Sequence, residues 1–246
     1  MSKDLFSNQA STYTRYRPVY PKELYNYILK FVTEKNMAWD CATGNGQAAL
    51  ALASYFKKVI ATDISEKQLL LAKPHANIQY HIAPAEQTNF PNNSFDLITV
   101  AQAYHWLKFD AFEKEVRRVA KKNAVIAVWG YNLLTANDAT IDALIKKFYF
   151  EIVGSYWDAE RKYVDDNYQS VPFNFNPLPI ENFFINAYWN KDDLIGYLNS
   201  WSGVQHFINT KQYNPVDDII NDLVPLWKDV KTVSFPLFLK LGRVNK

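Results

Sequence analysis

The stretch AWDCATGNGQAALALA, residues 38–53, places two glycines between an aspartate and a run of helix-forming alanines. The pattern predicts a strand that ends at Asp40, a turn through Gly44 and Gly46, and a helix that begins near Gln47. Glycine permits strained backbone conformations and lets a ligand approach the main chain without meeting a side chain. In open α/β folds, ligands bind where the parallel strands end. The stretch therefore predicts a ligand site above the bend.

Short β-prone segments alternate with helical segments on both sides of this bend. Strands are predicted at 37–40, 57–63, 77–83, 95–101 and 123–130, and helices at 21–35 and from Gln47, Ser65 and Phe109. Such alternation predicts an α/β fold with a doubly wound parallel sheet, helices on both faces and right-handed crossovers.

The pattern changes after Tyr131. A helix is predicted over residues 140–153, and the prolines and asparagines of residues 171–184 interrupt any regular element. Two late strands are predicted at 182–190 and 233–244, with helices at 192–201 and 216–227 between them. Pro236 favours a position at the sheet edge, because proline cannot donate a hydrogen bond to a neighbouring strand.

The overall composition favours a protein that acts on a small molecule. Of the 246 residues, 48% are hydrophobic, and a net charge of only +2 gives little electrostatic attraction for nucleic acid. The single cysteine, Cys41, excludes an internal disulfide and a cysteine-cluster metal site, and no metal is predicted. The sequence shows no signal peptide and no segment long enough to span a membrane, so we expect a soluble, cytoplasmic protein.

The second predicted strand ends in Asp63, whose carboxylate can accept hydrogen bonds from the two neighbouring hydroxyls of a ribose. Two nucleoside ligands are compatible with the bend. The spacing of Gly44, Gly46 and Ala49 also matches the dinucleotide fingerprint. However, a pyrophosphate beside Asp40 would be repelled, whereas a cation with an amino group, such as S-adenosylmethionine, would be attracted. The simplest alternative is a tight turn with no ligand, in which Asp63 caps the next helix.

The bend resembles the D-x-G-x-G-x-G motif of class I S-adenosylmethionine-dependent methyltransferases. Here the motif is Asp40-Cys41-Ala42-Thr43-Gly44-Asn45-Gly46, with Ala42 in place of the first glycine. The resemblance implies that Asp63 holds the ribose, that Ile64 packs on the adenine, and that the run Pro84-Ala85-Glu86 lies beside the adenine. The cofactor-binding candidates are therefore Asp40, Ala42, Gly44, Asn45, Gly46, Asp63, Ile64, Ala85 and Glu86, with Ala101 and Gln102 at the end of the fourth strand.

Further motifs resemble the small-molecule methyltransferases related to trans-aconitate methyltransferase, in the methyltransferase type 11 family. They are YTRYRPVYP (13–21), AQAYHW (101–106), YLNSWSGVQHF (197–207) and FPLFLKLGR (235–243). The resemblance implies a Rossmann-like sheet of seven strands, mostly parallel, with an antiparallel last strand.

It also implies a single domain, residues 1–246, that divides into four parts. These are an N-terminal lid segment with the first helix (1–35), a cofactor-binding core (36–130), a cap insertion (131–180), and closing strands and helices (181–246).

Several side chains are candidates for the chemistry. His105 is the nearest candidate for a general base if the acceptor needs one, and its alternative is a histidine that only packs. Arg17 and Tyr13 are further candidates for cofactor binding, in a segment that would order over the cofactor. Arg17 could pair with a carboxylate of the cofactor or of an acidic substrate. Gln102 could orient the cofactor or bond only to the backbone. The substrate-binding candidates are Tyr20, Tyr104, Trp106 and Trp201.

The favoured function is transfer of a methyl group to a carboxylate oxygen of a small molecule, since a carboxylate is ionised at neutral pH and needs no base. Two alternatives stay open on the sequence. One is a nicotinamide-dependent oxidoreductase that uses the same bend, and the other is a non-catalytic module that binds S-adenosylmethionine. Nucleic acid and membrane are not expected partners, and the oligomeric state is not predicted.

Overall fold

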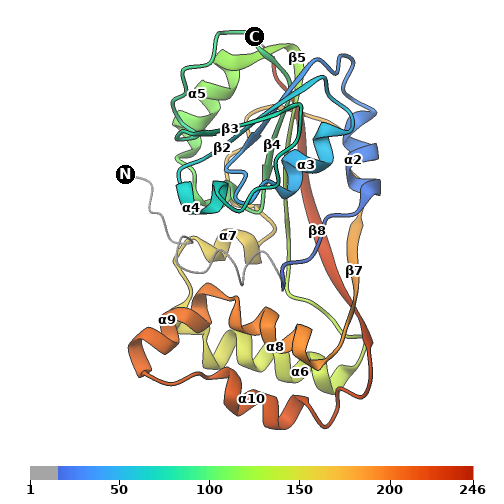
Figure 1. The fold of residues 1–246 in the computed structure, drawn as a ribbon, viewed down its shortest axis with the longest axis vertical. Coiled ribbons are helices and arrows are strands. Elements are labelled where there is room, and N and C mark those ends of the chain that lie inside the picture. The colour runs from blue at the N-terminus through green and yellow to red at the C-terminus, as the bar shows by residue number, and fades with distance from the viewer. Residues whose placement is uncertain (1–15, 246) are drawn as a thin grey trace.

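The computed structural model describes residues 16–245. Its centre is a twisted sheet in which five parallel strands lie in the order β3-β2-β1-β4-β5 (Figure 1). The strands are β1 (Met37–Cys41), β2 (Lys58–Asp63), β3 (Ile78–Ile82), β4 (Phe95–Ala101) and β5 (Ala120–Tyr131). Beside β5 lies the long antiparallel strand β8 (Lys231–Arg243). The predicted doubly wound, mostly parallel sheet is confirmed.

Within residues 16–245 the sheet has eight strands, one more than the predicted seven. The additional strand is the two-residue β6 (Asn176–Pro177), which pairs with one end of β8, while β7 (Phe183–Trp189) pairs with the other end. Because β8 is 13 residues long, it has room for both neighbours.

Pro236 lies in β8, which is an inner strand, so the prediction of an edge position is wrong. The strand tolerates proline because its partner β5 has already ended at that point. The carbonyl of Pro236 accepts a hydrogen bond from the N–H of Asn132, one residue past the end of β5. The missing N–H therefore faces the end of a strand and not the middle of a ladder.

Helices cover both faces of the parallel strands, with α2 (Lys22–Leu29) and α3 (Gln47–Ala53) on one face and α5 (Phe109–Val119) on the other. Consecutive strand residues pack on opposite faces. In β4, Leu97 belongs to the core under α2 and α3, whereas Ile98 belongs to the core under α5. Burial on both faces explains why the strands are continuously apolar in sequence.

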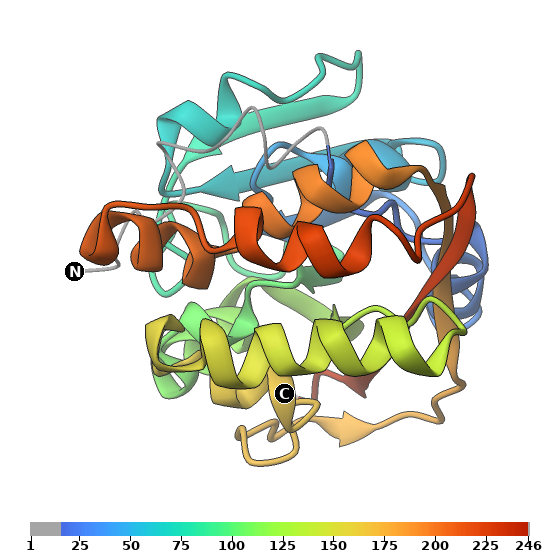
Figure 2. The same ribbon diagram turned by 90° about the horizontal axis from the view of Figure 1, so that it is seen from below.

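A second helical layer lies across the carboxyl ends of the parallel strands (Figures 1 and 2). It contains α6 (Ala139–Lys147), α8 (Lys191–Asn199), α9 (Ser202–Lys211) and α10 (Val216–Leu223). The predicted helix over 140–153 ends early, because α6 continues as a π-helix, Phe148–Ile152, and a 3-10 turn, Gly154–Tyr156. The short α4 (Glu66–Leu69) follows β2, the 3-10 turn Tyr104–Trp106 follows β4, and α7 (Arg161–Asp165) lies between the layer and the sheet.

Candidate functional site

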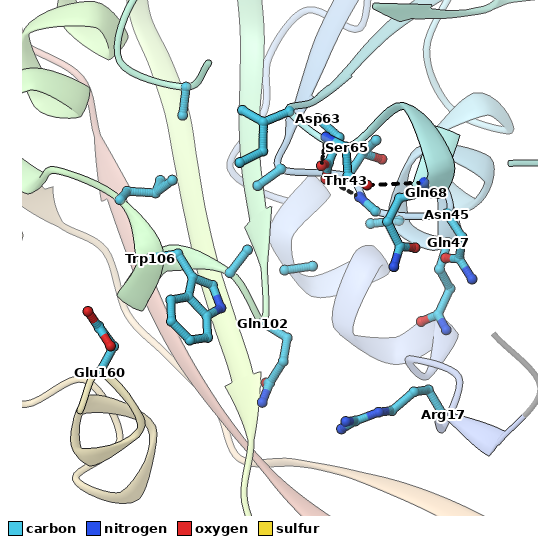
Figure 3. Close-up of a pocket in the computed structure, with 18 of the residues that line it drawn as sticks. Arg17, Thr43, Asn45, Gln47, Asp63, Ser65, Gln68, Gln102, Trp106 and Glu160 are labelled. Carbon is cyan, nitrogen blue, oxygen red and sulfur yellow. Dashed lines mark hydrogen bonds between the residues drawn. The ribbon is translucent and has the colours of Figure 1, made fainter. Parts of the chain in front are cut away.

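A cavity of about 320 Å³ lies between the carboxyl ends of the parallel strands and the helical layer. Figure 3 shows Thr43, Asn45, Asp63 and Ser65 on one side of it, with Trp106 and Glu160 on the other. The structure brings most of the predicted residues to this cavity. They are Arg17, Tyr20, Ala42, Gly44, Asn45, Asp63, Ile64, Ala85, Glu86, Ala101, Gln102 and Trp106.

The bend after β1 has a left-handed backbone at three positions. Gly44 has φ 57° and Gly46 has φ 80°, and a Cβ on Gly46 would lie 2.6 Å from the hydroxyl oxygen of Tyr80. Ala42 also has a positive φ, of 52°. A non-glycine residue rarely adopts this conformation, so the alanine at the motif's first glycine position is strained.

Three N–H groups of the bend already donate to acceptors within the protein. The N–H of Thr43 donates to the carbonyl of Thr62 at 2.9 Å, and that of Gly46 donates to the carbonyl of Thr43 at 3.0 Å. The N–H of Gly44 donates to the carboxylate of Asp63 at 2.8 Å. A pyrophosphate is normally bound by N–H groups that such a bend leaves open. This arrangement therefore disfavours a dinucleotide.

Asp63 ends β2 and lines the cavity. One of its carboxylate oxygens accepts from Gly44, and the other accepts from the N–H of Ser65 at 2.9 Å. These two bonds to main-chain N–H groups set the position of the carboxylate. The carboxylate is thus fixed by the main chain and fits the vicinal hydroxyls of a ribose.

Asp40 does not line the cavity but lies under the bend, with no exposed surface. It accepts hydrogen bonds from the hydroxyls of Thr99, at 2.7 Å, and Thr43, and from the N–H of Ala49 in the first turn of α3. Burial raises the pKa of Asp40 to about 6, even though these hydrogen bonds lower it. Asp40 therefore holds the bend and the start of α3 together.

Gln102 follows β4 and also has a positive φ, of 52°. Its amide oxygen accepts from the N–H of Tyr131 at 2.8 Å, and its amide nitrogen donates to the carbonyl of Tyr131 at 3.4 Å. The side chain thus bonds to the backbone of β5, as one of the two predicted alternatives has it, while it also lines the cavity. Glu86 accepts from the N–H of Lys108 at 3.0 Å at the cavity's far side.

A second, smaller cavity of about 40 Å³ adjoins the first. Arg17, Gln102, Trp106 and Asp158 line both cavities. The residues that line only the second are His105, Trp157, Arg161 and Ser202. The guanidinium of Arg17 donates to the hydroxyl of Tyr131 at 3.0 Å and to the carbonyl of Ser200 at 3.2 Å.

His105 is buried, and its Nδ1 lies 2.7 Å from the hydroxyl oxygen of Tyr168. Burial, followed by the positive charge of Arg161, lowers the pKa of His105 to about 3. The imidazole is therefore neutral at neutral pH, with one nitrogen already bonded within the protein.

Some predicted residues do not reach either cavity. Tyr104 is buried and donates from its hydroxyl to the carbonyl of Pro172 at 2.8 Å. Trp201 is buried among other rings, with its centroid 5.7 Å from that of Tyr197. Gly46 shapes the bend without lining the cavity, and Tyr13 lies outside the described residues.

Sequence reasoning missed Asp158, Arg161 and Tyr168, which all come from the segment between Tyr131 and Ile180. The only sequence signal was the spacing of Arg161 and Asp165, four residues apart, which is typical of a helix. Nothing in the local pattern indicated that this arginine faces a cavity.

Within residues 16–245, no three acidic, histidine or cysteine side chains are close enough to bind a metal ion. In the same part of the chain, no helix has the length and apolar character needed to cross a bilayer.

Comparison with known proteins adds independent information. Residues 39–128 match the methyltransferase domain family. A candidate methyltransferase of Dictyostelium discoideum is 34% identical over 249 residues, covering 98% of this chain and 95% of that protein. A candidate S-adenosylmethionine-dependent methyltransferase of Saccharomyces cerevisiae is 27% identical over 177 residues, covering 68% and 59%.

Among solved structures, a candidate type II methyltransferase of Anaeromyxobacter dehalogenans has a TM-score of 0.86 at 34% identity. It covers 93% of this chain and 98% of its own. The similarity thus extends over the bend, the sheet and the second helical layer together.

Proposed function

The chain belongs to the class I S-adenosylmethionine-dependent methyltransferases, and on that premise we propose that it methylates a carboxylate oxygen of a small molecule. S-adenosylmethionine is its cofactor, and the first cavity fits the groups of this molecule. Asp63 would accept hydrogen bonds from the ribose, and Ile64 and Ala85 would contact the adenine. Arg17 and Gln102 line the cavity at the junction with the second one, where they would hold the amino-acid part.

The observation that carries the proposal is the second cavity. It adjoins the cofactor cavity and is lined by two arginines, Arg17 and Arg161, and by one acidic residue, Asp158. An anionic acceptor would be attracted there. The histidine that lines this cavity, His105, is neutral, and its Nδ1 is bonded inside the protein. An acceptor that carries its own negative charge is therefore favoured over one that must lose a proton.

When bound, S-adenosylmethionine supplies a sulfonium methyl group, and a carboxylate oxygen can form the new C–O bond as the C–S bond breaks, with no proton transferred. The protein's own part is to position the acceptor and to exclude water. Trp106 lines both cavities and lies at their junction, so it would limit the access of water to the acceptor. Charge attraction and packing would then supply the acceleration.

The test is methyl transfer from S-adenosylmethionine with a deuterated methyl group to a panel of small carboxylic acids, phenols and amines, followed by mass spectrometry. We expect a labelled product that is an ester and is hydrolysed by mild base. Heat-inactivated protein with the same panel is the control. Labelled amines or phenols without labelled esters would refute the carboxylate assignment. Tight binding of S-adenosylhomocysteine with no labelled product in any class would favour a non-catalytic module.

A further inference from the structure

We propose that Arg161 and His105 form the binding site for the acceptor's carboxylate, in which neutral His105 donates a hydrogen bond from Nε2 and does not act as a base. This inference rests on the proposed function and specifies the residues of its acceptor site. It replaces the role of general base that the sequence suggested for His105.

Arg161 is held so that its outer edge faces the second cavity. Its Nε donates to the hydroxyl of Tyr149 at 2.6 Å and lies 3.4 Å from the carboxylate of Asp165. The guanidinium lies over the rings of Tyr149, at 5.3 Å, and Trp157, at 4.9 Å. Within residues 16–245, no group accepts a hydrogen bond from its two terminal nitrogens. Such an oriented pair of donors matches the two oxygens of a carboxylate.

The orientation of His105 follows from its contact with Tyr168. Burial raises the pKa of the Tyr168 hydroxyl, and the backbone N–H groups of His105 and Tyr104, which favour negative charge on its oxygen, have a smaller, opposite effect. We infer that the hydroxyl directs its own proton to Nδ1 of His105, 2.7 Å away. In a neutral imidazole whose Nδ1 accepts, Nε2 carries the hydrogen. His105 thus presents a donor to the cavity that its ring lines.

The backbone adopts a strained conformation at Tyr168. Asn167 and Tyr168 both have φ of 59°, in the left-handed region that bulky residues avoid. The N–H of Tyr168 donates to the carbonyl of Tyr163 at 2.7 Å, which fixes this turn. The hydrogen bond within the turn offsets the cost of the strained backbone, and the turn places the Tyr168 hydroxyl against His105. Tyr168 is therefore a positioning residue for the donor.

Acidic groups near the cavity limit where an anion can bind. Asp165 contacts the inner edge of Arg161, and Asp158 lines the junction of the two cavities. Asp158 repels an acceptor carboxylate close to it, so the acceptor is expected beside Arg161 and the His105 donor. Arg17 would serve the cofactor's carboxylate at the junction. Ser202 lines the same small cavity, where its hydroxyl would be a third donor.

The first experiment uses protein with ¹⁵N-labelled histidine, saturated with S-adenosylhomocysteine. The chain has four histidines, so the His105→Gln variant assigns the signal. We expect Nδ1 to be unprotonated and Nε2 protonated from pH 5 to pH 8. Titration of His105 near its ordinary pKa of about 6.5 would overturn the proposal, as would a proton on Nδ1. In Tyr168→Phe, the preference for Nε2–H should weaken, which a purely packing role for Tyr168 would not cause.

The second experiment adds sodium formate to the same complex and follows the Nε2 signal, with sodium chloride at equal ionic strength as the reference. Formate should shift this signal in a saturable way. Arg161→Gln should weaken formate binding at least roughly fivefold. Lys162→Gln removes an equal charge from the same helix, α7, without touching the cavity, and should change binding less than twofold. Equal effects of the two variants would overturn the proposal.

Measurements of methyl transfer then test the acceptor site and the proposed reaction separately. If carboxylic acids are methylated, His105→Gln should weaken binding of the acid, seen as a higher KM, and should leave the shape of the pH profile unchanged. Loss of a general base would instead lower kcat and change that profile. Methylation that is equally fast in Arg161→Gln and in the parent protein would refute the site and leave the reaction standing. Arg161-dependent formate binding without methylation of any carboxylic acid would refute the reaction and leave the anion site standing.

Discussion

The two ends of the cavity are built in different ways. At the bend after β1, hydrogen bonds between main-chain N–H groups and the acceptors of the neighbouring strand fix the backbone. At the second cavity, side chains from distant parts of the chain meet, as when Tyr168 contacts His105 and Arg17 donates to Tyr131. A site made of main chain holds one ligand shape and resists substitution. A site made of side chains can change its ligand by changing a few residues.

Among substitutions at the bend, Asp63→Ala should reduce cofactor affinity the most. Without the carboxylate, the two ribose hydroxyls lose hydrogen bonds worth about 1.5–3 kcal/mol each, so S-adenosylhomocysteine affinity should fall at least roughly 100-fold. Isothermal titration calorimetry measures this affinity.

Asp63→Asn is the matched control, because it keeps the size of the side chain and one oxygen acceptor. It should lose less affinity than Asp63→Ala. Unchanged affinity in both variants would show that the ribose does not bind at this carboxylate.

Asp40→Asn should stabilise the fold, and the gain should depend on pH. The folded state raises the pKa of Asp40 from 3.8 to about 6, so it binds more protons than the unfolded chain between these values. Stability of the parent protein is therefore lost through this group as pH rises from about 4 to 6. At pH 7 the free energy of unfolding of the variant should be higher by about 2 kcal/mol. This figure allows for the loss of some of the hydrogen bonds that the carboxylate accepts.

Urea denaturation of both proteins at pH 4.5 and pH 7 measures this gain, and the difference cancels the opposing contribution of His105. That histidine has a lowered pKa, so it makes stability rise with pH over about 3 to 6.5. A gain that is equal at both pH values would contradict a raised pKa for Asp40.

The bend end of the cavity was predictable from the sequence, because its signals are local. β4 has the predicted bounds, Phe95–Ala101, and the turn through Gly44 and Gly46 lies where the glycines indicated. Glycine, an acid at a strand end and alternating elements each reflect a backbone requirement that short-range sequence carries.

The second cavity was not predictable, because its residues act through contacts distant in sequence. Aromatic residues are suited to a core and to a pocket alike, so Trp201 and Tyr104 were expected at the substrate although both are buried elsewhere. Arg161 is positioned by its hydrogen bond to Tyr149, which lies in the π-helix. No periodicity in the sequence predicts such a helix. The short α7 and the polar α9 were missed for the same reason.

Arg17→Gln tests which end of the cavity this arginine serves. It lines both cavities, and we expect it to hold the carboxylate of the cofactor's amino-acid part. S-adenosylhomocysteine should then bind roughly tenfold more weakly, whereas 5′-methylthioadenosine, which lacks that carboxylate, should bind unchanged. Calorimetry with both ligands gives the comparison. Equal affinities of both ligands in variant and parent would assign Arg17 to the acceptor alone.

Ala42→Gly should have the smallest effect, and it tests whether the bend is set by the main chain. Ala42 has φ 52°, which costs an alanine about 1 kcal/mol more than a glycine, so the variant should be more stable by about that amount. Ala51→Gly, within α3, is the matched control and should destabilise by about 0.5–1 kcal/mol, because glycine is a poor helix former. Urea denaturation gives the change in the free energy of unfolding of each variant. Changes of opposite sign, with unchanged S-adenosylhomocysteine affinity for Ala42→Gly, would mean that alanine at position 42 adopts the same backbone conformation as glycine. A loss of stability in both variants would mean that the Ala42 methyl group contributes packing that outweighs its strain.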